Sequence, residues 1–306
     1  MELSPEAREL FAEEMAAKFL ATVDPEGRPN VALIVTLQPP PDGRKDRLIF
    51  GEFLMWRSKE YLANNPRVGM ACVNTKLKMV TLTGDFRGFE STGPYKEAID
   101  SSPLMRYNAY SGVRSAGVID VREQDPVRRA SFLSIPLDLV RLMAARRDGL
   151  PGGVEMPRLV REKFTMLTSI KALAVMGEDG YPRAIPVLPV VEKGSGLLLF
   201  RAAAYNRELA EVRTPCPAAM ALVTMDAKSY KVKGELLSAG RGRYALRVEE
   251  VYNAMPPRVG ERIVPPPSRG LTTDKRGLSV PARRDLPTFL RLNRINAPLA
   301  EALSTA

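Results

Sequence analysis

Residues 48–85 read LIFGEFLMWRSKEYLANNPRVGMACVNTKLKMVTLTGD, and residues 198–235 read LLFRAAAYNRELAEVRTPCPAAMALVTMDAKSYKVKGE. The two stretches align without a gap at an offset of 150 residues (198 − 48). The identical residues in the first stretch are Leu48, Phe50, Arg57, Met70, Ala71, Val73, Lys78 and Gly84. Upstream, residues 19–37 match residues 172–190. Self-similarity at a nearly fixed offset predicts that one structural unit is present twice.

Both copies predict the same order of elements. Two apolar runs flank a turn, DPEG in the first copy and EDG in the second, which predicts a β-hairpin. A third strand, a short helix and two further strands follow in each copy. Short strands with one crossover helix favour a small closed barrel, because closure leaves few exposed strand edges. We therefore expect a mainly β protein with peripheral helices, built as two tandem barrels.

The repeat also predicts how the chain is divided. Residues 1–124 form the expected first barrel, and residues 156–254 form the second. Residues 125–155 form a helical connector that includes the linker sequence GLPGG (149–153). Residues 255–306 form a Pro/Arg-rich tail, in which helical turns are expected at 285–303. Gly84 and Gly234 occupy matched strand positions, where a bulge or a close approach of backbones is expected.

Composition excludes several kinds of chemistry. The 306 residues contain no histidine, which rules out a Ser-His-Asp triad and any His-ligated zinc or haem. The two cysteines, Cys72 and Cys216, form no metal-binding or disulfide pattern, so a buried, inert thiol is expected for Cys72. No secretory signal and no membrane-spanning run is found, and we expect a cytoplasmic protein with no membrane partner.

The positive net charge does not by itself indicate nucleic-acid binding. The formal net charge is +10. Half of it comes from the tail, where nine Arg/Lys and four Asp/Glu give +5. The rest is spread thinly, without a basic helix or an aromatic RNA-binding motif, so no nucleic-acid partner is expected.

The segment 53–68, FLMWRSKEYLANNPRV, holds the candidate binding residues. A strand ends there, and Arg57, Ser58 and Lys59 open a helix. Free N–H groups at a helix start, two cations and a hydroxyl suit a phosphate group. The alternative is a solvated basic helix start with Ser58 as its N-cap.

This segment resembles the pyridoxamine 5′-phosphate oxidase-like FMN-binding split β-barrels. The resemblance rests on Trp56-Arg57-Ser58-Lys59, on the run from Leu62 to Val68, and on the hairpin at 20–37 and VTLTGDFRGFE at 80–90. It implies a flavin phosphate at Arg57, Ser58 and Lys59, with the ring and ribityl chain along Leu33, Ile34, Val35 and Thr36. Met79 stands where the family often has a Gln that faces the ring, and Trp56 is a candidate for stacking.

The second copy departs from this pattern. It keeps Arg207 but has Glu208 and Leu209 where Ser58 and Lys59 stand, and a carboxylate repels phosphate. Members of the family act as homodimers, so the duplication implies an internal pseudo-dimer with one degenerate site. Tyr230 and Lys231 of the second barrel would then wall the single flavin site. A further homodimer of the whole chain is compatible with this arrangement.

Three functions follow from the resemblance. The first is an FMN-dependent oxidoreductase that acts on a small redox substrate, with no catalytic residue identified. The second is a non-catalytic flavin-binding or sensing protein. The third keeps the fold and binds a deazaflavin in place of FMN. Pyridoxamine phosphate oxidase activity itself is not expected, because the Arg-x-His pair of that enzyme cannot occur here.

Overall fold

The computed structural model describes residues 1–106, 112–146, 149–194, 196–255 and 259–265. Met1–Pro265 form one compact unit. The second unit, Pro266–Ala306, includes the predicted helical turns at 285–303 and lies outside the described residues.

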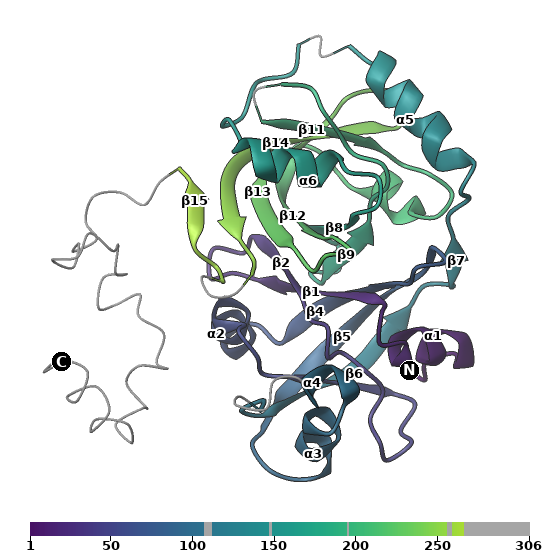
Figure 1. The fold of residues 1–306 in the computed structure, drawn as a ribbon, viewed down its shortest axis with the longest axis vertical. Helices are drawn as coiled ribbons and strands as arrows, with labels where there is room; N and C mark the ends of the chain where they lie inside the picture. Colours follow the sequence, from purple (N-terminus) through teal and green to yellow (C-terminus); the bar gives the residue numbers. More distant parts are fainter. Residues whose placement is uncertain (107–111, 147–148, 195, 256–258, 266–306) are drawn as a thin grey trace, which may run out of the picture. The chain divides into compact units, whose positions relative to one another are not determined.

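The first sheet is antiparallel and has the strand order β2-β1-β4-β5-β6-β3, with β7 paired to β5 (Figure 1). Its strands are β1 (Ala17–Val23), β2 (Pro29–Leu33), β3 (Arg47–Gly51), β4 (Arg67–Val73), β5 (Lys78–Glu90), β6 (Ala116–Gln124) and β7 (Arg128–Arg129). Beyond β2 the chain returns to the far edge, where Gln38 and Ile49 exchange backbone hydrogen bonds of 2.9 and 2.8 Å. This bridge joins the two edges of the sheet, as a closed barrel requires.

The second sheet is also antiparallel and has the order β10-β11-β14-β13-β12-β8-β9, with β15 paired to β14. Its strands are β8 (Ile170–Met176), β9 (Pro182–Pro186), β10 (Val191–Glu192), β11 (Leu197–Arg201), β12 (Cys216–Val223), β13 (Ser229–Ser238), β14 (Arg243–Asn253) and β15 (Arg262–Val264). The order β9-β8-β12-β13-β14-β11 repeats that of the first sheet strand for strand. The mainly β fold class is confirmed.

Strand register follows the sequence repeat. Met70 pairs with Leu82 in the first sheet, and Met220 pairs with Val232 in the second, 150 residues later in each strand. The register with the next strand shifts at Gly84 and at Gly234. A Cβ atom at Gly84 would lie 2.6 Å from the carbonyl oxygen of Asp120. The expected bulge and close approach at these glycines are confirmed.

The helices lie around the two sheets. They are α1 (Pro5–Ala12), α2 (Trp56–Asn64), α3 (Pro94–Asp100), α4 (Pro103–Arg106), α5 (Ser134–Ala144), α6 (Arg158–Thr165) and the 3-10 helix η1 (Arg207–Glu211). The Oγ of Ser4 caps α1 by accepting from the N–H of Ala7. In the second half of the chain, the expected crossover helix is the 3-10 helix η1. The predicted connector, residues 125–155, contains β7 as well as α5. Strand β15 adds the start of the predicted tail to the second sheet.

Each sheet encloses its own apolar core. Leu48, Phe50 and Met70 are fully buried in the first, and their counterparts Leu198, Phe200 and Met220 are fully buried in the second. Outward-facing positions of the two sheets meet in a third cluster that is rich in small residues. Its buried members are Ala17, Phe19, Ala21, Val31, Ala71, Ala172, Ala174, Ala184, Ala219 and Ala221. Small side chains let two sheet faces approach closely, so the two sheets share one buried junction.

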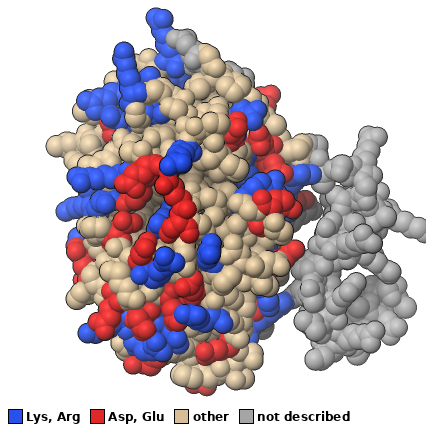
Figure 2. Space-filling model, turned by 180° about the vertical axis from the view of Figure 1, so that it is seen from behind, with Lys and Arg blue, Asp and Glu red and all other residues tan. Residues whose placement is uncertain are grey.

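Charged side chains of both signs are interspersed over the face in Figure 2. The positive net charge is therefore not gathered there into a single basic patch. In the described part of the chain, no helix is long and apolar enough to cross a bilayer.

Candidate functional site

The start of α2 is the element that positions the predicted binding residues. The helix follows β3 after a short loop in which Leu54 has a φ of 51°, and it ends at Asn64, with Asn65 as its C-cap before Pro66. Its N-cap is Met55, whose side chain makes no capping hydrogen bond. The alternative in which Ser58 is the N-cap is therefore wrong. The first-turn N–H groups have no side-chain cap, and the helix dipole favours an anion at this end.

Arg57, Ser58 and Lys59 do not make contacts with one shared partner. The Arg57 guanidinium lies 5.0 Å from the ring centre of Tyr252, which belongs to the second sheet. The Ser58 side chain is buried. The Lys59 ammonium lies 2.5 Å from a carboxylate oxygen of Glu52 in the first half of the chain. Arg57 is directed across the junction, whereas the charge of Lys59 is already paired.

Two lysines of β13 face α2 from the second sheet. Lys231 donates to Oδ1 of Asn30 at 2.6 Å, and its ammonium lies 5.3 Å from the centre of the Tyr252 ring. Lys233 lies 3.5 Å from a carboxylate oxygen of Asp24 and 5.7 Å from the ring centre of Tyr61. We call the group formed by Arg57, Tyr61, Lys231, Lys233 and Tyr252 the inter-sheet cluster.

Burial opposes the positive charge of the two lysines in the inter-sheet cluster. Burial, together with the charges of Lys233 and Arg57, holds the pKa of Lys231 well below its usual value. Burial also lowers the pKa of Lys233, although the Asp24 carboxylate opposes this. Among the described residues Lys233 has this ion pair, whereas Arg57 and Lys231 have none. Unmatched cations in a partly desolvated place favour binding of an anion.

The two tyrosines complete the cluster and stay protonated at neutral pH. Burial and the hydrogen bond to Glu250 raise the pKa of Tyr252 to about 12. Burial raises the pKa of Tyr61, although the nearby Arg57 opposes it. Burial raises the pKa of Glu250 as well, but hydrogen bonds from Tyr252 and Arg262 leave it below its usual value. The cluster therefore combines cationic donors, neutral phenols and two carboxylates at its edge, Asp24 and Glu250.

The predicted ring-binding strand positions have different environments. Ile34 lies in the core of the first sheet, and Leu33 packs partly buried at the junction. Val35 is exposed, and Thr36 is buried with its Oγ1 accepting from the N–H of Gly51 at 2.9 Å. Of these side chains, only Leu33 contacts the junction cluster that both sheets share.

Three further predicted residues lie in surroundings that sequence did not indicate. The indole N–H of Trp56 donates to the carbonyl of Val259 at 3.2 Å, so part of its polar edge faces the β14–β15 connection. Tyr230 is buried in the core of the second sheet. Met79 packs with Leu188 and Tyr205, which precede η1.

Strand register separates Met79 from the inter-sheet cluster. Met79 pairs with Val73, and Val73 pairs with Ala17 at the start of β1. The cluster lies beside Asp24, just beyond the end of β1. Met79 therefore lies near the start of β1, whereas the cluster lies near its end.

The turn of the second copy is occupied by the chain itself. Glu208 forms an ion pair with Arg128 of β7, and Leu209 is fully buried in the core of the second sheet. The Tyr205 hydroxyl donates to the backbone carbonyl of Leu188. Protein groups thus fill the surroundings of η1 among the described residues.

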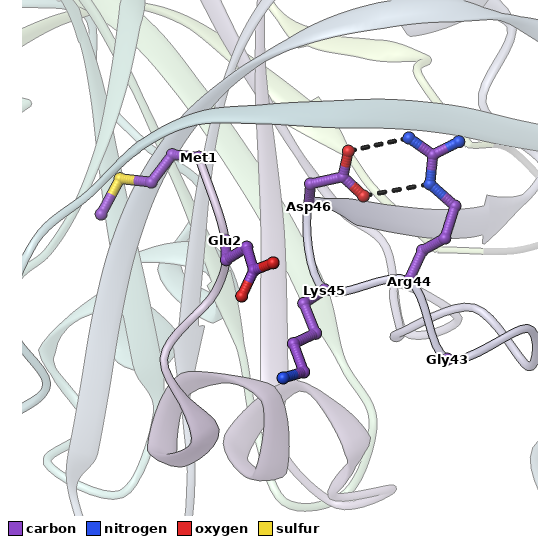
Figure 3. Close-up of a pocket in the computed structure, with 6 residues that line it drawn as sticks. All are labelled: Met1, Glu2, Gly43, Arg44, Lys45 and Asp46. Atoms are coloured by element: carbon purple, nitrogen blue, oxygen red, sulfur yellow. Dashed lines mark hydrogen bonds and ion pairs between the residues drawn. The ribbon is translucent and has the colours of Figure 1, made fainter.

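Two surface hollows lie elsewhere. One of about 490 Å³ is lined by Met1, Glu2 and residues 43–46, and Figure 3 shows its Arg44–Asp46 ion pair. A second of about 400 Å³ is lined by residues 129–133. Neither is lined by a residue of the inter-sheet cluster. No group of side chains suited to a metal ion occurs among the residues that the structure describes.

Sequence reasoning missed Asn30, Tyr61, Lys233 and Tyr252. The pattern Lys231-x-Lys233 was an available signal, because alternate residues of a strand share a face. Two lysines on one face of a predicted inner strand indicate either a solvent-facing edge or a buried anion site. The partners of these lysines come from other parts of the chain and leave no local pattern.

Comparison with known proteins gives a partial structural likeness. No protein-family model and no curated protein matches the chain. Among solved structures, an FMN-binding protein from Syntrophomonas wolfei subsp. wolfei is 18% identical, over 41% of this chain and 86% of that chain, with a TM-score of 0.35. An F420 reductase is 20% identical, over 40% and 98%, with a TM-score of 0.32. HutZ, the haem storage protein from Vibrio cholerae, is 18% identical, over 42% and 95%, with a TM-score of 0.30.

Proposed function

We propose that the chain binds FMN, with the phosphate at the start of α2 and the inter-sheet cluster beside it. The observation that carries this proposal is the Arg57 guanidinium, which has no ion pair with a described carboxylate and lies near buried Lys231 at a helix start without a side-chain cap. The donors fit a phosphate, because guanidinium, ammonium and free N–H groups all bind anionic oxygens. Lys59 fits less well than the sequence suggested, because Glu52 already neutralises it.

We further infer that the two sheets are duplicated split barrels that form an internal pseudo-dimer. Equal strand order, equal register at an offset of 150 residues and a bulge at Gly84 and Gly234 support a duplication. The shared alanine-rich junction supports a pairing of the two halves. In this proposal the second half supplies Lys231, Lys233 and Tyr252 to a site whose helix belongs to the first half.

The proposed activity is that of an FMN-dependent oxidoreductase with a small redox substrate. Bound flavin would supply the hydride or electron chemistry, which the side chains of this chain lack. The chain would bind the phosphate at Arg57 and orient the isoalloxazine ring along residues 33–36. Both cysteines are free, which is compatible with the cytoplasmic setting expected from the sequence.

The first experiment is the absorbance spectrum of freshly purified protein and its titration with FMN. We expect a flavin spectrum or saturable FMN binding at one site per chain. The Arg57→Ala/Lys59→Ala variant should lose the chromophore and keep its circular dichroism spectrum. Protein that never binds FMN would contradict the proposal.

Measurements on the same preparation also distinguish an FMN-dependent oxidoreductase from the two alternative functions. A deazaflavin in place of FMN would be recognised by the spectrum of the extracted chromophore and by titration with F420. Steady-state NAD(P)H oxidation by the flavin-loaded chain supports an oxidoreductase. Tight FMN binding without turnover would instead indicate a flavin-binding or sensing protein.

A further inference from the structure

Helix α5 presents an apolar face to solvent. The side chains of Leu133, Leu137, Val140 and Met143 are 86, 50, 62 and 62% exposed, and Phe132 just before the helix is 56% exposed. At about 100° per residue, the apolar positions from Met143 through Leu133 to Leu137 span about 120° of the helix. Surface helices normally turn such a face toward the core, so this one is suited to contact another surface.

The opposite face of α5 is firmly held by the second sheet. Leu142 is fully buried against Leu197 and Leu199 of β11. Asp138 is buried and accepts from Arg201 at 2.6 Å. The exposed apolar stripe is therefore presented by an anchored helix, which lies along the outside of the second sheet in Figure 1.

The exposed charges of residues 126–146 all have the same sign. Residues 126–146 contain one carboxylate, Asp138, and it is buried. Arg129, Arg141 and Arg146 are exposed. Lys193 adds a further cation where its ammonium donates to the carbonyl of Met143 at 2.6 Å. An apolar centre with a cationic rim complements an anionic surface that has an apolar interior.

A second copy of this chain matches the face less well. In a two-fold pairing the same patch meets itself, so the arginines would meet with no exposed carboxylate from this segment to pair them. An 11-residue helix is also only about 16 Å long, whereas a standard interface needs about 800 Å² from each partner. A bilayer surface requires no shape complementarity and supplies the negative charge.

We propose that residues 129–146 form a docking surface for membranes that contain anionic lipids. The apolar side chains of α5 would enter the headgroup boundary, and the surrounding arginines would contact lipid phosphates. This is attachment to a surface and not a membrane span. It differs from the expectation, drawn from sequence, that the chain has no membrane partner, and it is independent of flavin binding.

The test is co-sedimentation of the full chain with vesicles of phosphatidylcholine and phosphatidylglycerol, against vesicles of phosphatidylcholine alone. We expect binding to the anionic vesicles that falls as salt is raised. Leu133→Asp/Val140→Asp should weaken binding at least about tenfold, while both sites are exposed enough to keep the fold. Leu159→Asp is the matched control, because Leu159 is an exposed leucine on α6. It should bind as the natural sequence does.

Three results would overturn the proposal. One is the absence of binding to anionic vesicles, and another is equal binding by the double variant. The third is a dimer in sedimentation velocity that the double variant converts to a monomer, since a second copy would then cover the face.

Discussion

The ammonium of Lys231 lies 2.6 Å from Oδ1 of Asn30, and these residues are 201 positions apart in the chain and belong to different sheets. The amide of Asn30 is oriented by Thr22, whose Oγ1 accepts from Nδ2 at 3.2 Å. A lysine ammonium has three N–H donors, and Asn30 accepts from one of them. The Lys231 ammonium and the Arg57 guanidinium lie 5.3 and 5.0 Å from the centre of the same Tyr252 ring.

Lys231 should therefore matter more for ligand binding than for folding. Lys231→Met should weaken FMN binding by about 10- to 100-fold, the value of a hydrogen bond to a charged group. Stability at neutral pH should change little or rise, because burial already disfavours the charge that is removed and lowers the pKa of Lys231. FMN titration and urea denaturation measure the two effects. Lys228→Met is the control, because Lys228 is exposed and pairs with Asp226. Equal losses of affinity in both variants would contradict the assignment.

Arg57 and Lys59 should give different phenotypes despite lying two residues apart. Arg57→Ala should lower FMN affinity at least about tenfold with little change in stability, because no carboxylate in the described part of the chain pairs with it. Lys59→Ala should affect affinity less and reduce stability, because it leaves the buried Glu52 carboxylate with Ser115 alone, at 2.6 Å. Adding Glu52→Gln should restore part of that stability. The proposal would fail if Lys59→Ala abolished FMN binding while Arg57→Ala did not.

The elements of the fold could be predicted because their signals are local and occur twice. The hairpin expected around DPEG in the first copy is formed by β1 and β2. The bulge glycines follow from the same repeat. The partners of the site residues could not be predicted. Lys59 pairs with Glu52 and Arg57 contacts Tyr252, yet both cations occupy one short motif. The direction of each side chain depends on packing between segments that are distant in sequence. The local motif therefore does not predict it.

Lys171 should make stability depend on pH. The side chain is fully buried, burial lowers its pKa from 10.5 to about 7, and its nitrogen donates to the carbonyls of Met166 and Ser169 at 2.7 and 3.0 Å. A neutral amine has two N–H donors, which these two carbonyls satisfy. Between pH 7 and 10.5 the unfolded chain holds the extra proton, so the free energy of unfolding rises with pH, by up to about 5 kcal/mol.

This contribution is measured by urea denaturation of the natural sequence and of Lys171→Met from pH 7 to 10. The difference in the free energy of unfolding should shift in favour of the natural sequence as the pH rises. Below pH 7 the difference should be constant, because lysine is protonated in both states. A difference independent of pH across this range would show that Lys171 titrates normally.

Gly69 should tolerate no larger residue, because β4 approaches β9 of the second sheet there. A Cβ atom at Gly69 would clash with the backbone carbonyl of Pro182, which cannot turn away as a side chain could. Gly69→Ala should cost about 1–3 kcal/mol of stability through overpacking of the junction. Ala221→Gly, at the same junction, adds no atom and should not create a clash. Thermal denaturation compares the two, and a neutral Gly69→Ala would mean that the sheets can separate locally.

Glu208 should stabilise the contact between the connector and the second half. Its ion pair with Arg128 is partly buried, and its second carboxylate oxygen is buried without a hydrogen-bond partner among the described residues. Glu208→Ala should reduce the free energy of unfolding by about 1–3 kcal/mol, because Arg128 loses a charged acceptor. Arg128→Ala/Glu208→Ala should cost less than the sum of the single variants, since the double variant leaves no buried charge unpaired. Urea denaturation of all four proteins gives the coupling energy. Purely additive losses would mean that the pair contributes no interaction of its own, and that only Leu209 and its core neighbours hold this turn in place.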